Sequence, residues 1–426
     1  MKKTLGWSLL IVLFIFSCST FSARKTVITY WTHTDDNRTR IENRYIAEFT
    51  KMHPDVEIKR VVNEASKMGD IVLTAFAANN GPDLFNLPIE QEYGYMMNHR
   101  VAPVDYKLLG YKNWAALKDD YADNTFDAVT MKGKIYGLPL EVTNWSIFIN
   151  KKIFRSVGLD PEKDYPKTWE EMADISEKLV LRNGDIITRR GFDFRYPYYL
   201  VSFIPMVQQL GGDLLSADGK KAIVNDQAWI KALDFMKAWG PHGRNLGSPT
   251  YVNARKIFDN DNNDMAMCLS GFYQEGRIKV DNPEFYDSGE WMVVPFPVFE
   301  DAAQDVRCAY YGHYLMVNDS ISKQKKQIAW KFIDYMLSHP VEYLTEVNII
   351  QPRKDLVESE LFKSLPYTDV FMDDMAKAKP VFLHENGSQF ERYIKEAVEE
   401  VMLTNADSEE ALATLKRKIQ EVLDED

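Results

Sequence analysis

Aromatic residues are grouped in several short polar segments of the chain. There are 9 Trp, 22 Tyr and 23 Phe, and most of them must lie in a hydrophobic core. Four groups, however, stand among polar or turn-forming residues, at 30–31, 196–199, 271–273 and 310–314. A Tyr or Trp ring combines a flat apolar face with a hydrogen-bonding edge. A core role alone is difficult to argue for these groups, and the chemistry they offer is non-covalent binding.

Sequence motifs of the common enzymes are absent. The chain has no G-x-S-x-G, H-E-x-x-H, P-loop or G-x-G-x-x-G pattern. Its seven His residues form no i, i+4 pair, and the acidic run 259–264 lacks the glycine and the glutamate of a calcium loop. Paired carboxylates for glycoside hydrolysis stay an alternative, because 63 acidic residues supply many pairs. We expect no cofactor, no metal and a binding protein rather than an enzyme.

The first 24 residues have the layout of an export signal. Lys2 and Lys3 precede an uncharged run from 4 to 23, and Arg24 follows it. The Ile-Phe-Ser-Cys segment that ends at Cys18 resembles the lipobox of bacterial lipoproteins, in which the cysteine thiol is lipidated. Cleavage by an ordinary signal peptidase and an uncleaved anchor are the alternatives. We expect an exported protein, periplasmic or at the cell surface, with a lipid anchor at the membrane.

Composition limits the partners and the number of domains. About 400 mature residues exceed one typical core, which predicts two domains. Without Lys2 and Lys3 the chain has 49 basic and 63 acidic residues, a net charge of −14. This charge argues against nucleic acid or an anionic membrane surface as a partner. Of the remaining cysteines, Cys268 and Cys308 could form one disulfide or be two buried thiols.

Hydrophobic periodicity alternates between strand and helix. The β-branched and aromatic run 27–31 is followed by helical spacing up to Pro54, and a second apolar run covers 56–62. Such alternation is typical of a mostly parallel sheet covered by helices on both faces. Further elements are predicted as a strand at 84–85 and helices at 68–78, 169–179 after the Thr168–Glu171 capping box, 327–338 and 408–423.

A series of motifs in the centre of the chain resembles a known family. Residues 136–139 (Tyr-Gly-Leu-Pro) are followed by 148–154, 158–160 and 166–171 (Pro-Lys-Thr-Trp-Glu-Glu). In order and spacing they resemble the signature of the extracellular solute-binding proteins of ABC importers, family 1, the maltose-binding-protein-like sugar-binding lipoproteins. Flanking motifs agree, so that the resemblance extends over 26–426.

The resemblance implies an α/β fold of two lobes, the type II periplasmic-binding-protein fold, with a ligand cleft between them. It implies one lobe from 26–139 with 290–345 and a second from 140–289 with 346–426. A monomer would capture a carbohydrate by hinge closure and deliver it to the permease subunits of an ABC transporter. The alternatives are another solute, such as a polyol phosphate or a peptide, and an exported glycan-active hydrolase.

Candidate ligand contacts follow from the resemblance and from the chemistry of sugars, which present apolar C–H faces and a rim of hydroxyls. The candidates are Trp31, His33, Asp35, Glu90, Glu141, Asn144, Tyr198, Phe272, Tyr273, Tyr311, His313 and Phe390. The alternative for each single aromatic residue is core packing, and Asp35 could simply cap the next helix. Glu141 and Asn144 could be solvated hinge residues.

Overall fold

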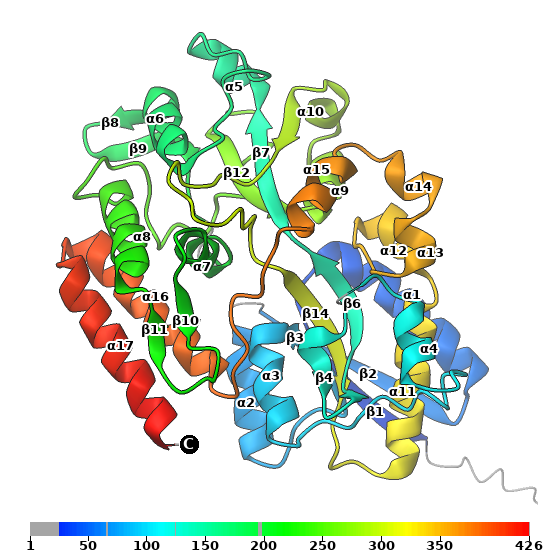
Figure 1. Ribbon diagram of the computed structural model, residues 1–426. Helices are drawn as coiled ribbons and strands as arrows, with labels where there is room; N and C mark the ends of the chain where they lie inside the picture. The colour runs from blue at the N-terminus through cyan, green and yellow to red at the C-terminus, as the bar shows by residue number, and fades with distance from the viewer. Residues whose placement is uncertain (1–24, 65–66, 124, 195–197, 426) are drawn as a thin grey trace, which may run out of the picture.

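Two five-stranded sheets organise the chain, one in each half of the molecule in Figure 1. The computed structural model describes residues 25–64, 67–123, 125–194 and 198–425. The export signal and Cys18 therefore lie outside the described residues. Within the described part, no helix combines the length and the apolar character needed to cross a bilayer.

The first sheet lies in the lower half of Figure 1 and defines the first lobe. It has the order β2-β1-β3-β14-β6 and consists of β1 (Thr26–His33), β2 (Val56–Asn63), β3 (Leu84–Pro88), β14 (Tyr311–Val317) and β6 (Leu138–Thr143). The β1 strand is parallel to β2 and β3, whereas β14 is antiparallel to β3 and β6.

The second sheet lies in the upper half and defines the second lobe. It has the order β13-β7-β12-β9-β8 and consists of β13 (Trp291–Val294), β7 (Trp145–Asn150), β12 (Met265–Gly271), β9 (Ile186–Phe192) and β8 (Leu181–Asn183). Only β9 and β12 pair in parallel in this sheet. Both sheets are thus mixed rather than mostly parallel. The strands on either side of the lobe crossings pair antiparallel with their neighbours; these strands are β6, β7, β13 and β14.

The chain passes from the first sheet to the second at Asn144, between β6 and β7. It returns between β13 and β14. The β13 strand pairs with β7 in the second sheet, although the division expected from the sequence placed 290–345 with the first lobe. Strand pairing therefore moves the beginning of that segment to the second lobe.

Helices cover the sheet faces of the first lobe. The Asp35 carboxylate caps the first helix by accepting a hydrogen bond from the N–H of Arg38, 3.1 Å away. Ser322 caps the helix that follows β14, which begins earlier than the expected residue 327. The elements are α1 (Asp36–Met52), α2 (Met68–Ala77), α3 (Ile89–Met97), α4 (Trp114–Asp119), η2 (Asp127–Val129), β4 (Thr130–Met131), β5 (Lys134–Ile135), α11 (Lys323–Leu337) and α12 (Pro340–Val347).

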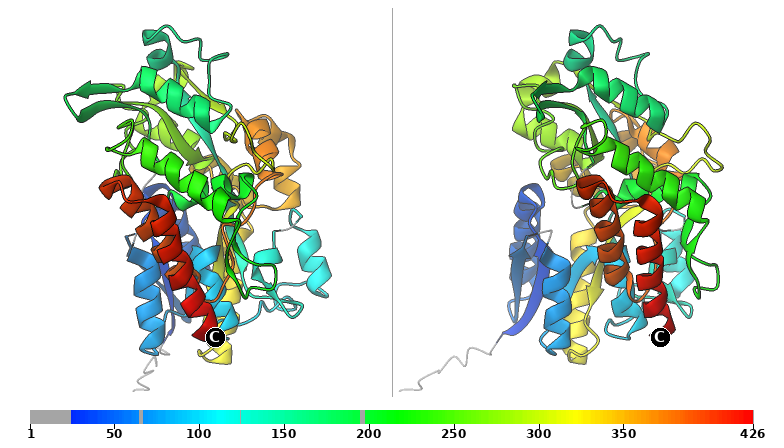
Figure 2. Two further views of the ribbon diagram at one scale, coloured as in Figure 1. Left: turned by 60° about the vertical axis from the view of Figure 1, so that its left-hand side comes forward. Right: turned by 90° about the vertical axis from the view of Figure 1, so that its left-hand side faces the viewer.

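The second lobe carries more helices, and α16 and α17 lie side by side along α8 (Figure 2). The Thr168 hydroxyl accepts from the N–H of Glu171 as the capping box predicts, but the Glu171 carboxylate accepts from the N–H of Lys167. The elements are α5 (Lys151–Ser156), α6 (Trp169–Leu179), α7 (Leu200–Gln209), β10 (Asp213–Leu215), β11 (Ala222–Val224), α8 (Asp226–Trp239), α9 (Tyr273–Asp281), α10 (Pro283–Asp287), α13 (Lys354–Val357), α14 (Glu360–Lys363), α15 (Thr368–Met375), α16 (Gly387–Thr404) and α17 (Ser408–Glu425).

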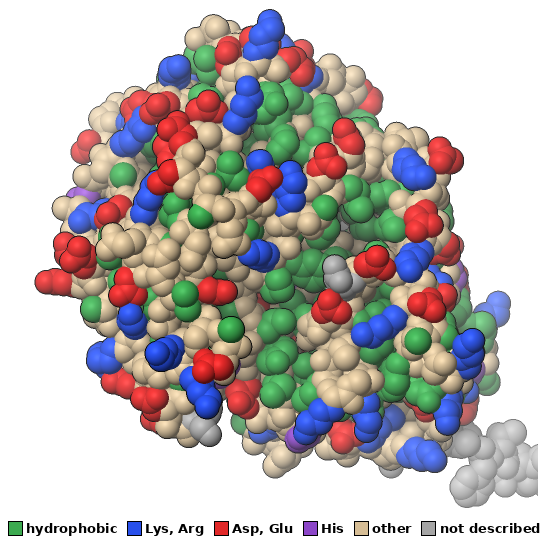
Figure 3. Space-filling model, viewed as in Figure 1, with side chains coloured by type: hydrophobic (Ala, Val, Ile, Leu, Met, Phe, Trp, Pro, Cys, Tyr) green, Lys and Arg blue, Asp and Glu red, His purple; other side chains and the backbone are tan. Residues whose placement is uncertain are grey.

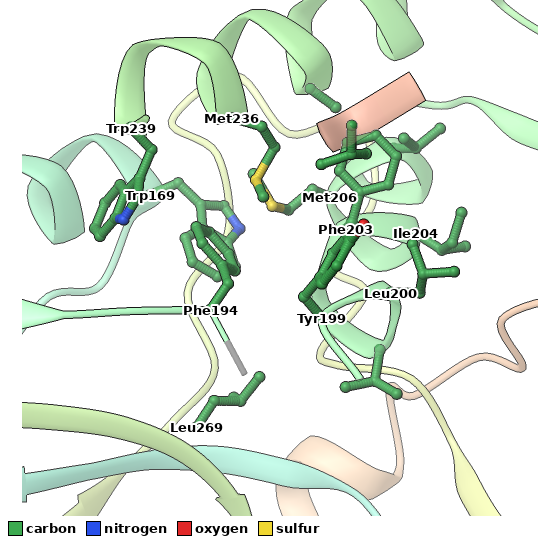
Figure 4. Close-up of a cluster of buried hydrophobic side chains, with 14 of the residues drawn as sticks. Trp169, Phe194, Tyr199, Leu200, Phe203, Ile204, Met206, Met236, Trp239 and Leu269 are labelled. Atoms are coloured by element: carbon green, nitrogen blue, oxygen red, sulfur yellow. The ribbon is translucent and has the colours of Figure 1, made fainter. Parts of the chain in front are cut away.

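Large aromatic side chains fill the core of the second lobe, part of which Figure 4 shows. Trp169 stacks on Phe194 with ring centroids 5.8 Å apart, and its indole N–H donates to Gln209 Oε1 at 3.1 Å. Both Cys268 and Cys308 are buried free thiols. The disulfide alternative is therefore not realised.

A buried ion network joins α1 to the first sheet. Glu42 is completely buried and lies between two guanidiniums, with Arg38 Nε at 3.0 Å and Arg60 Nε at 2.8 Å. The Tyr30 hydroxyl donates to the same carboxylate at 3.0 Å. Arg38 also donates to Thr32 Oγ1 and to the His33 carbonyl. The end of β1 and the start of α1 are thereby fixed to each other.

Replacing Glu42 with Gln should lower the free energy of unfolding by about 3–5 kcal/mol, because two buried guanidiniums lose their shared carboxylate. Guanidinium chloride unfolding followed by fluorescence measures this. Glu48→Gln, at an exposed position of the same helix, is the matched control and should change little, because its amide oxygen can still accept from the Tyr335 hydroxyl. Equal stability of the two variants would show that the network contributes nothing to the fold.

Candidate ligand-binding site

Three neighbouring strands of the first sheet bring His33, Asn86 and His313 together. His33 ends β1, Asn86 lies in β3, and His313 lies in β14 on the other side of β3. The two imidazole rings are 4.9 Å apart, and Asn86 Nδ2 lies 3.3 Å from His313 Nδ1. Side chains from the outer two strands therefore meet beside a residue of the middle one.

Both imidazoles at this point are held uncharged. Burial and the nearby Arg38 guanidinium lower the pKa of His33 well below its usual value. The same two causes lower the pKa of His313 to about 3. A neutral imidazole has one N–H donor and one acceptor nitrogen. At neutral pH the pair therefore supplies hydrogen-bonding groups without net charge.

Polar groups continue along β6 to the lobe crossing. Glu141 is directly opposite His313 in the antiparallel register of β6 and β14, and it is 7% exposed. Asn144 stands at the crossing itself and is 1% exposed. Its Nδ2 has no hydrogen-bond partner among the described residues. The interpretation of these two as solvated hinge residues is wrong, since both are buried.

An ion pair joins the two lobes next to this group. Arg277 in α9 of the second lobe donates to Asp35 Oδ2 at 3.0 Å. Although burial raises the pKa of Asp35, Arg277 and Arg38 outweigh this effect and lower it. The guanidinium carbon of Arg277 also lies 5.9 Å from the ring centroid of Tyr273, in the first turn of α9. Asp35 thus caps α1 with one oxygen and binds the other lobe with the second.

Three aromatic rings of the second lobe surround the start of β7 and the end of β12. Trp145 and Tyr198 meet edge to face with centroids 6.3 Å apart. A Cβ atom at Gly271 would lie 2.7 Å from a Tyr273 ring carbon and 3.2 Å from a Trp145 ring carbon. The missing side chain at Gly271 therefore lets these two rings approach the backbone.

The lobes also touch on the opposite side of the crossing, between α3 and α16. Gln91 Nε2 lies 3.4 Å from Glu391 Oε2, and a cavity of about 20 Å³ is lined by Glu90, Tyr198 and Glu391 among others. Burial, together with the Glu391 charge, raises the pKa of Glu90 to about 8. Glu90 therefore faces the other lobe, in a cavity that can hold about one water.

Hydrophobic side chains also gather along the middle of the face in Figure 3, where the lobes meet.

The backbones of the two lobes approach each other closely at this second contact. A Cβ atom at Gly94 in α3 would lie 2.4 Å from the Glu385 carbonyl oxygen, and one at Gly387 would lie 2.6 Å from the Glu90 carbonyl oxygen. Neither distance is compatible with a side chain. Glycine at both positions is therefore required for the observed contact of α3 with α16.

The remaining candidates lie elsewhere. Phe272 packs against Phe362 and Phe371 in a buried cluster, and Phe390 is fully buried in the core of the second lobe. Trp31 is half-buried against the core of the first lobe. These three residues therefore pack in or against a hydrophobic core, which was the alternative to a ligand contact. Tyr311 pairs with Thr143 through its backbone, and its side chain lies outside what the structure describes.

Sequence reasoning missed Asn86, Trp145 and Arg277. Trp145 follows Asn144 directly, so its place at the crossing was a readable signal. Asn86 is a single polar residue within an apolar strand, which a search for buried polar positions could have selected. Arg277 meets Asp35 across 242 residues, and no local pattern indicates that contact. Among the described residues there is no cluster of three or more His, Cys, Asp or Glu suited to a metal ion.

Curated proteins similar to this chain bind solutes. The arabinooligosaccharide-binding protein of Bacillus subtilis (strain 168) is 22% identical over 236 residues, which are 54% of this chain and 52% of that protein. The lactose-binding protein of Rhizobium radiobacter is 20% identical over 304 residues, 70% of this chain and 67% of the relative. The first match thus spans about half the length of its relative.

Solved structures and a family model agree with the two-lobed arrangement. A solute-binding protein of an ABC transporter from Thermotoga lettingae TMO, bound with α-D-tagatose, has a TM-score of 0.80 at 21% identity. The match covers 94% of this chain and 100% of that one, which confirms the expected two-lobed α/β fold. The family model of bacterial extracellular solute-binding proteins matches residues 35–343. Because this match extends over most of the chain, the protein belongs to the bacterial extracellular solute-binding protein family.

Proposed function

We propose that the protein captures a carbohydrate between its lobes by hinge closure and delivers it to the permease subunits of an ABC transporter. The observation that carries the proposal is the junction of the lobes. There, neutral polar groups of the first lobe, including His33 and His313, lie near the Asp35–Arg277 pair, and aromatic rings such as Tyr273 belong to the second lobe. Aromatic faces with hydrogen-bonding groups suit the C–H faces and hydroxyls of sugars.

Support for a sugar also comes from the relatives, whose names state arabinooligosaccharide and lactose as their ligands. A polyol phosphate or a peptide is the less favoured ligand. The proposed catch-and-release cycle involves no covalent step, so the protein acts as a binding protein rather than as a glycan hydrolase. We place it outside the inner membrane as a monomer, anchored through a lipid on Cys18.

Thermal shifts of residues 25–426 with monosaccharides, oligosaccharides, polyol phosphates and peptides test the ligand class. A ligand that binds only the folded state raises the melting temperature in a saturable way. We expect such a shift from a sugar that is recovered unmodified. Consumption of the sugar would favour the hydrolase, and a shift from phosphates or peptides alone would overturn the carbohydrate proposal.

Glu141→Ala should abolish sugar binding without unfolding the protein, because Glu141 lies opposite His313 in the strand register, three residues before the lobe crossing at Asn144. Titration calorimetry measures the affinity, and circular dichroism verifies the fold. Glu57→Ala in β2, in the same lobe but away from the crossing, should bind like the wild type. Unchanged affinity of the Glu141 variant would remove this residue from the site.

Arg277→Gln should open the ligand-free protein, because the variant loses the ion pair with Asp35 that joins the lobes. Small-angle scattering should show a larger radius of gyration, and sugar affinity should fall about fivefold for a pair worth about 1 kcal/mol. The wild-type pair should be complete at neutral pH and lost as the pH falls through the lowered pKa of Asp35.

Arg277→Lys is the matched control for that experiment. It keeps the positive charge opposite Asp35 without disturbing the cap of α1, and it should retain part of the compact ligand-free state. If Arg277→Gln leaves both the scattering profile and the affinity unchanged, the pair does not stabilise the closed arrangement.

A further inference from the structure

We propose that Asn86, together with His33 and His313, forms a subsite that hydrogen-bonds the hydroxyls of an uncharged sugar ring. This inference rests on the proposed function and specifies it. It adds a residue that neither the motifs nor the family resemblance selected, and it names the charge class of the ligand.

The first argument is the unsatisfied amide of Asn86. The side chain is 0% exposed, and its Nδ2 faces His313 Nδ1 at 3.3 Å. Its Oδ1 has no hydrogen-bond partner among the described residues. A buried polar group without a partner is costly, which indicates that a bound molecule supplies the missing hydrogen bond.

The second argument is the position of Asn86 in the sheet. It is the central residue of β3 (Leu84–Pro88), two residues before the carboxyl end of the strand, and β3 is parallel to β1 and antiparallel to β14. In open α/β sheets, ligands bind outside the carboxyl ends of parallel strands where the strand arrangement changes. His33 and His313 reach this place from the two strands that flank β3. Three side chains from three strands therefore converge at one point of the lobe junction.

The third argument is the balance of charge around the subsite. Both imidazoles are uncharged at neutral pH. The nearby Arg277 is paired with Asp35, and Arg38 contacts the buried carboxylate of Glu42. A phosphate or carboxylate group would have to compete with these carboxylates for a cation. A hydroxyl group needs no such partner.

A sugar hydroxyl also has the right hydrogen-bonding capacity. It can donate to the Asn86 Oδ1 and accept from another group at the same time, whereas a carboxylate can only accept. Neutral imidazoles both donate and accept, so a ring whose hydroxyl satisfies the amide can also present neighbouring hydroxyls to His33 and His313. The subsite thus selects an uncharged, hydroxyl-rich ligand.

Titration calorimetry with lactose, maltose, arabinobiose, glucose 6-phosphate and glucuronate tests this inference. At least one uncharged sugar should bind the wild type, and the two anionic sugars should bind at least about tenfold more weakly. Asn86→Leu keeps the approximate size of the side chain but removes the amide. It should weaken binding of the uncharged sugar about tenfold, the effect of one lost hydrogen bond.

The stability of the ligand-free protein separates a binding role from a structural one. Asn86→Leu removes an unsatisfied buried atom but also the contact of Nδ2 with His313 Nδ1, so its melting temperature without ligand should fall by no more than the loss of one hydrogen bond produces. Asn86→Ala is the second variant in case Leu does not fit. Asn98→Ala, at the exposed end of α3, is the control and should bind normally.

Deoxy analogues of the bound sugar give an independent measurement. The analogue that lacks the hydroxyl facing Asn86 should bind the wild type and Asn86→Leu with equal affinity. Normal sugar affinity of the Asn86 variants together with lower stability would overturn the subsite and assign Asn86 a structural role with water. Tighter binding of the anionic sugars would overturn the charge class. Failure of every sugar to bind the wild type would instead overturn the proposed function itself.

Discussion

The passage of the chain at Asn144 is the constraint on which the site depends. The consecutive strands β6 and β7 belong to different sheets, so that Glu141 and Trp145, four residues apart, belong to different lobes. Groups on the two sides of the crossing are therefore close whatever the angle between the lobes, whereas groups farther away, such as Asp35 and Arg277, meet only when the lobes are together. The proposed ligand contacts near the crossing therefore do not depend on the angle between the lobes, whereas the proposed closure contact between Asp35 and Arg277 does.

A buried ion network around Arg38 holds the part of the first lobe that faces the junction. The Arg38 side chain binds Glu42 and the His33 carbonyl, while its backbone N–H is bound by Asp35. One residue thus ties together the end of β1, the cap of α1 and the buried carboxylate behind them. Charged groups inside a protein are stable only when they are well paired, and here the paired Arg38 also holds the His33 carbonyl with its guanidinium and the Asp35 carboxylate with its backbone N–H.

Local sequence signals predicted where helices and strands lie better than they predicted which strands pair with each other. The spacing up to Pro54 gave α1, and Thr168 marked the beginning of α6. Strand direction was not predictable, because the neighbours of β14 are set by contacts more than a hundred residues away in the chain. Composition also cannot separate a binding ring from a core ring. Phe272 and Phe390 have the same chemistry as an aromatic residue that stacks on a sugar, yet tertiary packing encloses both.

The contact of α3 with the start of α16 is a close approach of main chain to main chain between the lobes. At Gly94 and Gly387 main chain meets main chain, and a backbone cannot yield as a flexible side chain does. In the observed arrangement, the separation of α3 from residues 385–387 is therefore set by the backbones themselves. Any residue larger than glycine at either position would push α3 away from residues 385–387. Under the proposed hinge closure, the space left for a ligand would depend in part on two glycine positions that need not touch it.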